Sequence, residues 1–430
     1  MSLLGFDRQD ITPEIGCFLY GYVDDLRAES IHDRLNVNAF YMKNDETSAL
    51  MISAEVCSIN TEFSARMRRE ISLATGVPSE NIILHGIHNH TGPNTDGNTG
   101  WGRLDIEYCE NILLPATVKA SENAVKSAKE ALVGFAMGTS LVGVNRREQT
   151  PENHVIFGQC EWGCFDPRMA VFSFKTTDGE NIANLVYYTC HGTCAGVNTA
   201  ISRDWAGGMT DALHKHTSAP TAFFCGPEGD VGPRLPNGQT VGKIEDVELM
   251  GTKAGEDAKG IFDTITEYRP FEFSVIPSSI EIPLKRRIDK EDALEKLLEF
   301  RNERINLEGQ IRDYCERVLK SYEDDYIDMR ARTIEQTLLS INNNVFVAMP
   351  FELFSEIALR INKAKNGFEV FCLSNANGSE GYFPTQSEIP KGGYEINMYL
   401  THFIQPYCDN ADWHLIKETL KNLEGFKCIE

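Results

Sequence analysis

Apolar runs separated by amphipathic stretches fill the first two thirds of the chain. The segment SALMISA at Ser48–Ala54 is typical of a buried strand, and NIILH at residues 81–85 predicts a second strand. Residues 62–75 lie between them and carry an apolar residue at every fourth position, as on one face of a helix: Phe63, Met67, Ile71. This order predicts a β-α-β unit, in which the two strands run parallel.

Further apolar segments continue the same alternation of strands and helices. Four have the length and composition of buried strands: residues 183–189, 221–225, 345–349 and 369–373. Residues 105–132 are expected to form a long helix, which Pro115 should bend or divide because proline has no amide hydrogen. The pattern predicts the α/β class, with a large mixed-sheet core and flanking helices.

The most charged part of the chain, residues 289–325, predicts a long helix or a helical hairpin. Its expected packing face is formed by four apolar residues: Leu294, Leu297, Leu298, Phe300. No internal repeat or flexible linker interrupts the chain. We therefore expect a single catalytic domain over residues 1–430, with a helical insertion at about 286–330.

Composition and charge narrow the range of functions. Of the 430 residues 42% are hydrophobic, which is enough to bury a large core. The formal net charge of -22 argues against nucleic acids and anionic membranes as partners, because both attract a surplus of Lys and Arg. No apolar run reaches the roughly 18 residues of a spanning helix, and the first residues, MSLLGFDRQD, lack the basic start of a signal peptide. We expect a cytoplasmic protein that acts on a small molecule without stable membrane association.

Polar loops rich in histidine, carboxylate and glycine follow the ends of five predicted strands. The five strand-to-loop junctions are NIILH-GIHNHTGPN, ANLVYYT-CHGTCAGVN, TAFFC-GPEGDVGP, VFVAM-PFE and EVFCL-SNANGSEGY. In α/β sheets, ligand sites form beyond the carboxyl ends of the strands. The sequence therefore predicts one cleft at this edge of the sheet.

Histidine and glutamate residues in these loops suggest a metal site. His88 and His90 are two apart, so an extended backbone points both imidazoles to one side, one toward a metal and the other toward water or substrate. His191 and Glu352 occupy two of the other loops. Two histidines and one glutamate form a recognised catalytic zinc set that leaves a coordination position free for water.

These motifs, taken in order, resemble the neutral/alkaline (non-lysosomal) ceramidase family of zinc amidases. HNHTGPN is similar to the family's H-T-H-S-G-P, NRRE to N-R-S, and EGDVGP to G-D-V-S-P. CHGT followed by NTAISRDWAG is similar to H-G-T…N…I-S-x-D-x-x-G, and PFE to P-G-E. SNANGSEGYFPT followed by GGYE is similar to a family stretch with two tyrosines twelve residues apart.

The resemblance implies a role for individual residues. It implies one zinc ion per chain, with four protein ligands: His88, His191, Glu352, Tyr382. It places three residues around the reacting amide: His90, Arg146, Tyr394. The implied reaction is metal-assisted amide hydrolysis, in which His90 is the general acid or base and Arg146 and the tyrosines stabilise the oxyanion. Asp204 and Asp230 match family carboxylates that are expected to orient the ligands.

The chain departs from the family pattern at two positions near the expected site. Gly232 stands where the family has serine, which excludes a serine nucleophile at that position. Phe351 replaces a glycine beside Glu352 and is expected to reshape the pocket. We expect neither an immunoglobulin-like C-terminal domain nor an export signal.

These departures leave three functions open. The first is a zinc amidohydrolase that acts on a soluble N-acyl compound rather than on ceramide. The second is a zinc hydrolase or lyase that acts on a carbohydrate or an ester. The third is a non-catalytic, ligand-binding homologue.

Overall fold

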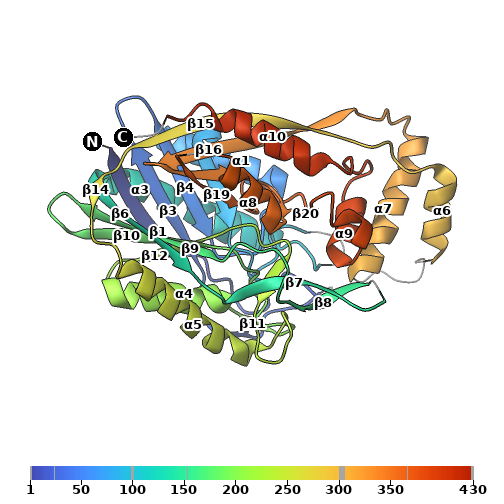
Figure 1. The fold of residues 1–430 in the computed structure, drawn as a ribbon, viewed down its shortest axis with the longest axis horizontal. Coiled ribbons are helices and arrows are strands. Elements are labelled where there is room, and N and C mark those ends of the chain that lie inside the picture. The colour runs from blue at the N-terminus through green and yellow to red at the C-terminus, as the bar shows by residue number, and fades with distance from the viewer. Residues whose placement is uncertain are drawn as a thin grey trace.

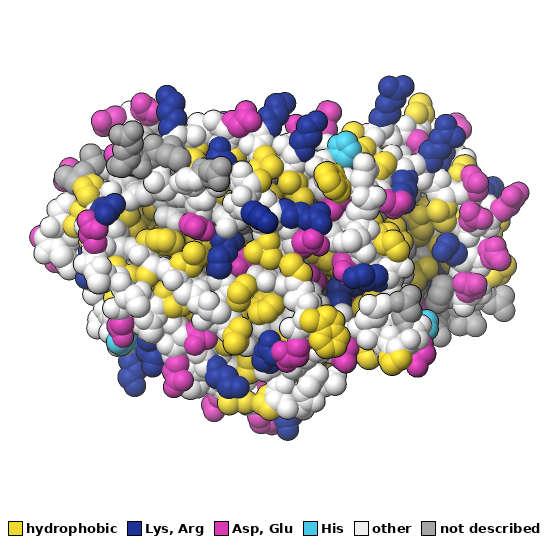
Figure 2. Space-filling view, viewed as in Figure 1, with side chains coloured by type: hydrophobic (Ala, Val, Ile, Leu, Met, Phe, Trp, Pro, Cys, Tyr) yellow, Lys and Arg dark blue, Asp and Glu magenta, His cyan; other side chains and the backbone are white. Residues whose placement is uncertain are grey.

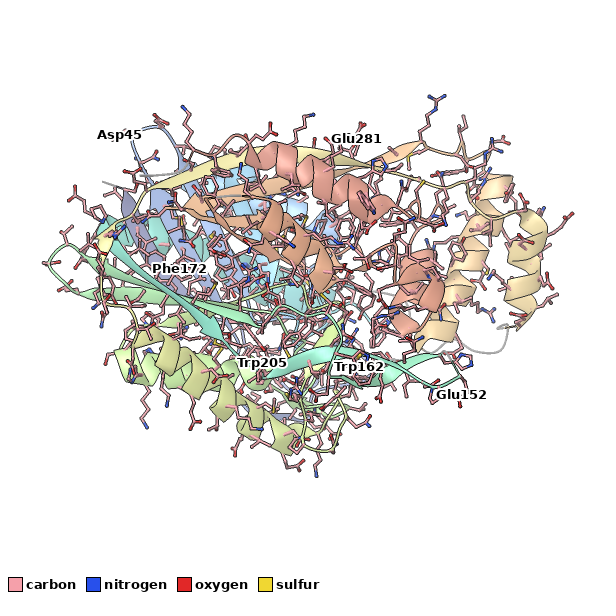
Figure 3. All side chains as sticks on the ribbon, viewed as in Figure 1. Asp45, Glu152, Trp162, Phe172, Trp205 and Glu281 are labelled. Atoms are coloured by element: carbon pink, nitrogen blue, oxygen red, sulfur yellow. The ribbon has the colours of Figure 1, made fainter. Side chains whose placement is uncertain are left out.

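Two β-sheets pack face to face, and helices cover the outer face of each (Figure 1). The structure, a computed structural model, describes residues 2–23, 25–97, 101–152, 154–299, 306–365 and 367–427. The layer between the sheets is aromatic, because phenylalanines alternate inward along strands of both sheets. Phe172, labelled in Figure 3, lies in this layer and contacts rings from both sides: Phe135, Phe346, Phe371.

The larger sheet has the strand order β12-β10-β9-β6-β1-β3-β4-β5, and the short strand β14 (Arg269–Pro270) pairs with β6. Its strands, in chain order, are β1 (Leu3–Asp10), β3 (Asn36–Lys43), β4 (Ser48–Ala54), β5 (Ile82–Gly86), β6 (Lys129–Thr139), β9 (Arg168–Thr176), β10 (Asn181–Tyr188) and β12 (Thr221–Cys225). The pairs β4–β5 and β10–β12 are parallel, whereas the other pairs are antiparallel. The predicted mixed sheet and the predicted parallel β-α-β unit are therefore confirmed.

The smaller sheet has the order β15-β16-β17-β19. Its strands are β15 (Phe273–Pro283), β16 (Ala331–Ile341), β17 (Asn344–Ala348) and β19 (Glu369–Leu373). Strands β17 and β19 run parallel, as do β4 and β5 in the larger sheet. The carboxyl ends of these parallel strands carry the polar loops that the sequence singled out.

Three pairs of helices cover the two sheets. Helices α1 (Thr61–Thr75) and α3 (Leu114–Ser127) pack on the β3–β4–β5 side of the larger sheet, and α4 (Asp204–Thr217) and α5 (Ile244–Phe262) cover its other half. Helices α8 (Ser355–Ala364) and α10 (Ala411–Leu423) cover the smaller sheet. Trp205, in the first turn of α4, fills the space between that helix and the sheet (Figure 3).

The helix predicted over residues 105–132 is shorter and less regular than expected. It consists of α2 (Ile106–Tyr108), a π-helical turn (Cys109–Leu113) and α3, and it ends at Ser127. The π-helical turn directly precedes Pro115, whose missing amide hydrogen removes one helical hydrogen bond. The prediction that residues up to 132 are helical is wrong, because β6 begins at Lys129 and pairs with β9.

The predicted helical insertion is a hairpin of α6 (Lys290–Glu299) and α7 (Asn306–Glu323). It has a small core of its own: Ala293, Tyr314, Cys315, Val318. Leu297 packs against this core, but Leu294 and Leu298 are 44% and 66% exposed, so the predicted packing face is wrong at these two positions. The buried stripe follows Ala293 and Leu297, one helical turn apart, and Leu294 and Leu298 lie about 100° around the helix from it. Phe300 lies outside the described residues.

Shorter elements surround the loops at the sheet edge. They are β7 (Gly143–Gln149), β8 (Val155–Cys160) and β13 (Val231–Pro233), the parallel pair β18 (Glu352–Leu353) and β20 (Tyr382–Phe383), the pair β2 (Ser30–Ile31) and β11 (Ala200–Ile201), and helix α9 (Tyr394–Thr401). Helix α9 packs against α7 of the hairpin (Figure 1).

The edge strand β12 of the larger sheet also meets β4 and the opposite edge strand, β5, along a contact that we call the β5–β12 seam. Two hydrogen bonds form it. The hydroxyl of Ser53 donates to the carbonyl of Phe223 at 2.6 Å, and the amide of Cys225 donates to Nε2 of His85 at 3.1 Å. The seam draws the loops after β5 and β12 together.

Figure 2 shows acidic and basic side chains interspersed over the visible face of the molecule. Among the described residues, no helix is both long and apolar enough to span a membrane.

Candidate metal centre and active site

Three ligand-type side chains from distant parts of the chain meet at the predicted sheet edge. His88 follows β5, His191 follows β10, and Glu352 begins β18 shortly after β17. A carboxylate oxygen of Glu352, Oε2, lies 3.2 Å from Nε2 of His88 and 3.2 Å from Nε2 of His191. The three ligand atoms fall within 4.8 Å of one another, which is the spacing expected of donors that share one metal ion.

The imidazole of His191 is oriented as a metal ligand would be. Its Nδ1 donates to the backbone carbonyls of Glu228, at 2.7 Å, and Val231, at 3.0 Å. A carbonyl only accepts hydrogen bonds, so the proton is on Nδ1 and the lone pair of Nε2 points into the site. Nε2 of His191 and Oε2 of Glu352 are both buried, and neither has a hydrogen-bond partner among the described residues. Buried polar atoms are rarely left unpaired, so these two fit a group that is bound between them.

The electrostatics of the site favour a positive charge. Burial alone would lower the pKa of His88, but the neighbouring Cys57 and Glu352 raise it well above its ordinary value. Burial and the neighbouring Arg146 lower the pKa of His191 to about 3, so His191 is neutral. The buried carboxylate of Glu352 therefore attracts a cation, and the donor set suits a divalent metal ion.

The loops that carry His88 and His191 are hydrogen-bonded to each other. The amide of His90 donates to the carbonyl of Gly192 at 3.0 Å, and the amide of Gly192 donates to the carbonyl of His88 at 3.2 Å. A Cβ atom on Gly192 would lie 2.9 Å from that carbonyl oxygen, so the approach requires glycine. This explains the glycine that follows the histidine in CHGT.

Tyr382 joins the same group through strand pairing. In the parallel pair of β18 and β20, Tyr382 lies directly opposite Glu352. The hydroxyl of Tyr382 accepts a hydrogen bond of 2.9 Å from Nη2 of Arg146. The structure thus places all four residues that the family resemblance gives as ligands in one site.

Arg146 reaches the site from β7 and is held there by a buried ion pair. Its Nε donates to Glu395 at 2.8 Å, and the same carboxylate accepts from Arg147 at 2.6 Å. Burial would lower the pKa of Arg146, but Tyr382 and Glu395 hold it above its ordinary value, so the guanidinium stays charged. Tyr394, next to Glu395, packs its ring 5.7 Å from that of Tyr382.

His90 lies beside the metal-ligand group, on the side that aromatic rings enclose. Its Nε2 is 3.3 Å from Nε2 of His88, so both rings point to the same side, as the spacing predicted. Burial, together with the neighbouring His88 and His191, lowers the pKa of His90 well below its ordinary value. His90 is therefore neutral, and one of its ring nitrogens carries no proton.

Asp204 and Asp230 contact the backbone and neighbouring side chains rather than the ligand rings. Asp204 accepts from the amides of Cys194 and Ala195, at 3.1 and 2.9 Å, and so fixes the loop that follows His191. Asp230 accepts from the amide of Ser355 at 2.8 Å and from the side chain of Asn145 at 3.1 Å. Asp230 thereby ties β7 to the segment after Glu352.

Gly232 lies against Thr240, whereas Phe351 lies in the hydrophobic core. A Cβ atom on Gly232 would lie 2.6 Å from Cβ of Thr240, so a serine does not fit here unless Thr240 moves. Phe351 is fully buried in the core, and its ring packs against Phe383 and Tyr407 with centroids 4.6 and 6.1 Å apart. The expectation that Phe351 reshapes the pocket is wrong, because its ring belongs to the core.

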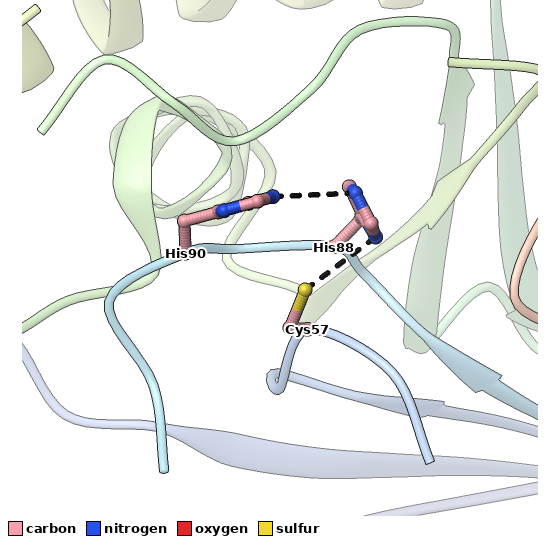
Figure 4. A group of neighbouring side chains, drawn as sticks. All are labelled: Cys57, His88 and His90. Carbon is pink, nitrogen blue, oxygen red and sulfur yellow. Dashed lines mark hydrogen bonds between the residues drawn. The ribbon is translucent and has the colours of Figure 1, made fainter. Parts of the chain in front are cut away.

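Three residues that the sequence did not single out surround His88. Sγ of Cys57 lies 3.5 Å from Nδ1 of His88, and Figure 4 shows Cys57 below the two imidazoles of His88 and His90. The amide nitrogen of Asn375 lies 3.0 Å from the same Nδ1 and donates to Oε1 of Glu228 at 2.7 Å. Glu228 stands two residues before Asp230 in EGDVGP. The sequence feature that could have indicated Glu228 is the position of this loop directly after a predicted strand.

Comparison with known proteins agrees with this geometry. The family profile described as "Neutral/alkaline non-lysosomal ceramidase, N-terminal" matches residues 2–241, more than half of the chain. The chain belongs to this family. The family is one of hydrolases that act on amide bonds. No curated protein sequence matches the chain.

Two solved ceramidase structures share the fold. Neutral ceramidase from Pseudomonas aeruginosa is 17% identical, with a TM-score of 0.74, and the match covers 100% of this chain and 75% of the bacterial one. A ceramidase complexed with C2 is 15% identical, with a TM-score of 0.73, and the match covers 100% of this chain and 76% of that chain. At these identities the likeness establishes the fold of this ceramidase homologue and nothing finer.

Proposed function

We propose that this ceramidase homologue is a zinc-dependent amidohydrolase that cleaves the N-acyl bond of a soluble small molecule. The observation that carries the proposal is the meeting of His88, His191 and Glu352, in which two inward-facing ligand atoms have no hydrogen-bond partner among the described residues. Tyr382, opposite Glu352, would complete the set of four ligands for one zinc ion per chain. A bound zinc ion there would polarise the substrate carbonyl and lower the pKa of a coordinated water.

The neighbouring residues have the protonation states that amide hydrolysis requires. Neutral His90 would accept a proton from the attacking water and later deliver it to the leaving amine. The charged guanidinium of Arg146 and the phenol of Tyr394 would stabilise the negative charge that develops on the carbonyl oxygen, each by about 3 kcal/mol. Burial raises the pKa of Tyr394 well above its ordinary value, so its hydroxyl keeps the proton that it would donate.

Both halves of the chain would contribute to one catalytic unit. His88 and His191 come from the larger sheet, whereas Glu352 and Tyr382 follow strands of the smaller one. We therefore propose that residues 1–430 act as a single catalytic domain, with α6 and α7 as an insertion. The interspersed surface charge agrees with a cytoplasmic enzyme that acts on small molecules.

Metal analysis and an amidase assay together test this proposal. Protein purified without chelator should contain about one zinc per chain and should release the amine from a simple N-acetyl anilide. Removal of the metal should abolish the release, and added zinc should restore it. A zinc content below about 0.2 per chain would contradict the proposal, as would hydrolysis that persists unchanged after the metal has been removed.

A further inference from the structure

Two hydrogen-bond donors beside the site are buried and have no partner among the described residues. Nε1 of Trp101 and the hydroxyl of Tyr22 have no hydrogen-bond partner within the described part of the chain. Both residues are partly exposed, yet their polar atoms are buried, so the polar end of each ring points into the protein. Buried donors are paired in more than about nine cases in ten, so two in one place call for a ligand.

Both donors flank the proposed general base. The ring centroid of Tyr22 lies 5.6 Å from that of His90, and the centroid of Trp101 lies 6.3 Å from it. The rings of Tyr22 and Trp101 are themselves 6.2 Å apart, and Trp101 extends to Tyr394, 6.0 Å away on the other side. A molecule that reacts at His90 would therefore lie close to both donors.

The backbone at Tyr22 supports a role in binding. Its φ angle is 65°, in the left-handed region that a large side chain rarely adopts. Gly21, just before it, brings the chain against the ring of His90, where an added Cβ would lie 3.3 Å from Nδ1. Strain of this kind persists where the surrounding structure holds a residue in place, and it concentrates at ligand sites.

The surrounding charges select a neutral ligand. The charge of the Arg146 guanidinium is already balanced by the carboxylate of Glu395, so it does not require a carboxylate on the ligand. Aromatic faces with a few convergent donors are suited to a compact ligand that has both C–H faces and oxygen acceptors.

We propose that Trp101 and Tyr22 form a subsite for the amine side of the substrate, and that this side is neutral and rich in hydroxyl oxygens, as in an N-acylated amino sugar. The indole N–H and the phenol O–H each donate to a ligand oxygen beside His90. The inference rests on the proposed amidohydrolase function and adds the chemical class of the group that the enzyme releases.

Two matched amides test the subsite. N-acetylglucosamine and N-acetylcyclohexylamine have the same acyl group and a six-membered ring, but only the sugar carries hydroxyls. The zinc-loaded wild type should hydrolyse the sugar amide with a kcat/KM about 10-fold or more above that of the cyclohexyl amide, because buried donors left unpaired disfavour the latter.

Conservative variants identify the donors. Trp101→Phe and Tyr22→Phe keep an aromatic ring and remove only the donor, so each should lower kcat/KM for the sugar amide about 10-fold and change the cyclohexyl amide by less than about twofold. Trp413→Phe, at a 63% exposed position on α10, is the matched control and should change neither. Equal losses on both amides, or no loss on either, would overturn the subsite.

Binding distinguishes failure of the subsite from failure of the proposed function. Calorimetric titration of the same two compounds needs no turnover, so it applies even to a chain that cleaves neither. Tighter binding of N-acetylglucosamine that Trp101→Phe abolishes would support the subsite even in an inactive protein. Equal binding of both compounds by the wild type would overturn it, whatever the zinc content and the anilide assay show.

Discussion

His85 and His88 lie three residues apart at the end of β5, and both are buried, with exposed fractions of 0% and 1%. The ring of His85 belongs to the β5–β12 seam, where Nε2 accepts the amide hydrogen of Cys225. Its Nδ1 has no partner within the described ranges, so a free ring nitrogen does not by itself mark a metal ligand. Around His88, by contrast, Glu352 and His191 converge on one side.

The backbone separates the two histidines as well. His85 is an ordinary strand residue, whereas His88 has a φ angle of 65°. A non-glycine residue in the left-handed region costs about 1–2 kcal/mol. The hydrogen bonds from the amide of His88 to the carbonyls of Val56 and Cys57 hold it in that conformation. The convergence of metal-ligand atoms on a residue with a strained backbone is thus a better indication of a catalytic site than burial alone.

The largest expected effect is on zinc content. His88→Ala removes a proposed ligand and should leave the purified protein without stoichiometric zinc and without amidase activity. His85→Ala leaves the buried amide of Cys225 unpaired, so it should lower the free energy of unfolding by about 1–3 kcal/mol but retain zinc. Elemental analysis of both variants tests the comparison, and equal zinc contents would remove the distinction drawn here.

The next largest effect is expected at two adjacent arginines. As with the two histidines, one belongs to the candidate site and the other supports the structure around it. Arg146 contacts Tyr382 and Glu395 in the site, whereas Arg147 contacts Glu388, Glu395 and the carbonyl of Gly392. Arg146→Lys loses the forked geometry and should lower kcat about 100-fold with zinc content unchanged.

Arg147→Lys provides the matched control. It should lower the melting temperature and reduce kcat by less than about 10-fold. If the two variants lost the same amount of kcat, Arg146 would have no special role at the reacting carbonyl.

A smaller effect is expected in the pH dependence of stability. Burial lowers the pKa of His85 in the folded chain to about 3, against about 6.5 in the unfolded chain. Between these values only the unfolded chain binds the proton, so this histidine favours folding above pH 6.5, and that contribution is lost as the pH falls.

His85→Gln measures this contribution. From pH 7.5 to pH 5 the wild type should lose about 2 kcal/mol more of its unfolding free energy than His85→Gln, which cannot titrate. Denaturant unfolding of the metal-free proteins at both pH values gives the difference. Parallel losses would mean that His85 is not held neutral by the seam.

The smallest expected effect concerns the residues around Nδ1 of His88. Glu228 holds Asn375, and Asn375 contacts Nδ1 of His88. Glu228→Gln should weaken zinc binding about 10-fold, because such partners orient a ligand without binding the metal. Glu335→Gln, at an exposed carboxylate paired with Arg68, is the control and should leave affinity unchanged. Competition with a chromophoric chelator measures both, and an unchanged affinity in Glu228→Gln would show that Asn375 needs no support.

Much of the fold was predictable because short apolar runs bounded by turns specify buried strands with little need for tertiary information. The segments around β4, β5, β12 and β19 were placed to within about one residue. The helix over residues 105–132 was overextended, because Ala124, Ala128 and Ala131 continue the spacing of a helical stripe, and only the hydrogen bonds from β9 make the last of them part of a strand. The apolar face of α6 was misjudged because only tertiary packing decides which leucines meet α7.

The site was predictable to the extent that each strand end carries a distinctive residue. The loops after β5, β10 and β17 carry His88, His191 and Glu352, whereas Tyr382 came from the shared motifs alone. Glu228 and Asn375 were missed because their importance lies in contacts with His88 across 140 or more residues, which no local pattern encodes. Trp101 and Tyr22 were missed because a sequence does not show whether the polar atom of an aromatic ring has a hydrogen-bond partner.

The loop after β19 has a second consequence, for the solubility of the chain. Residues 375–377 run along the free side of β5. The amide of Gly86 donates to the carbonyl of Asn375, and Asn377 exchanges hydrogen bonds with the backbone of Leu84. Exposed strand edges recruit strands from other molecules, and β5 is entirely apolar apart from His85 and Gly86. By covering this edge, the segment that contacts the candidate metal ligand through Asn375 also shields β5 from pairing with a strand of another molecule.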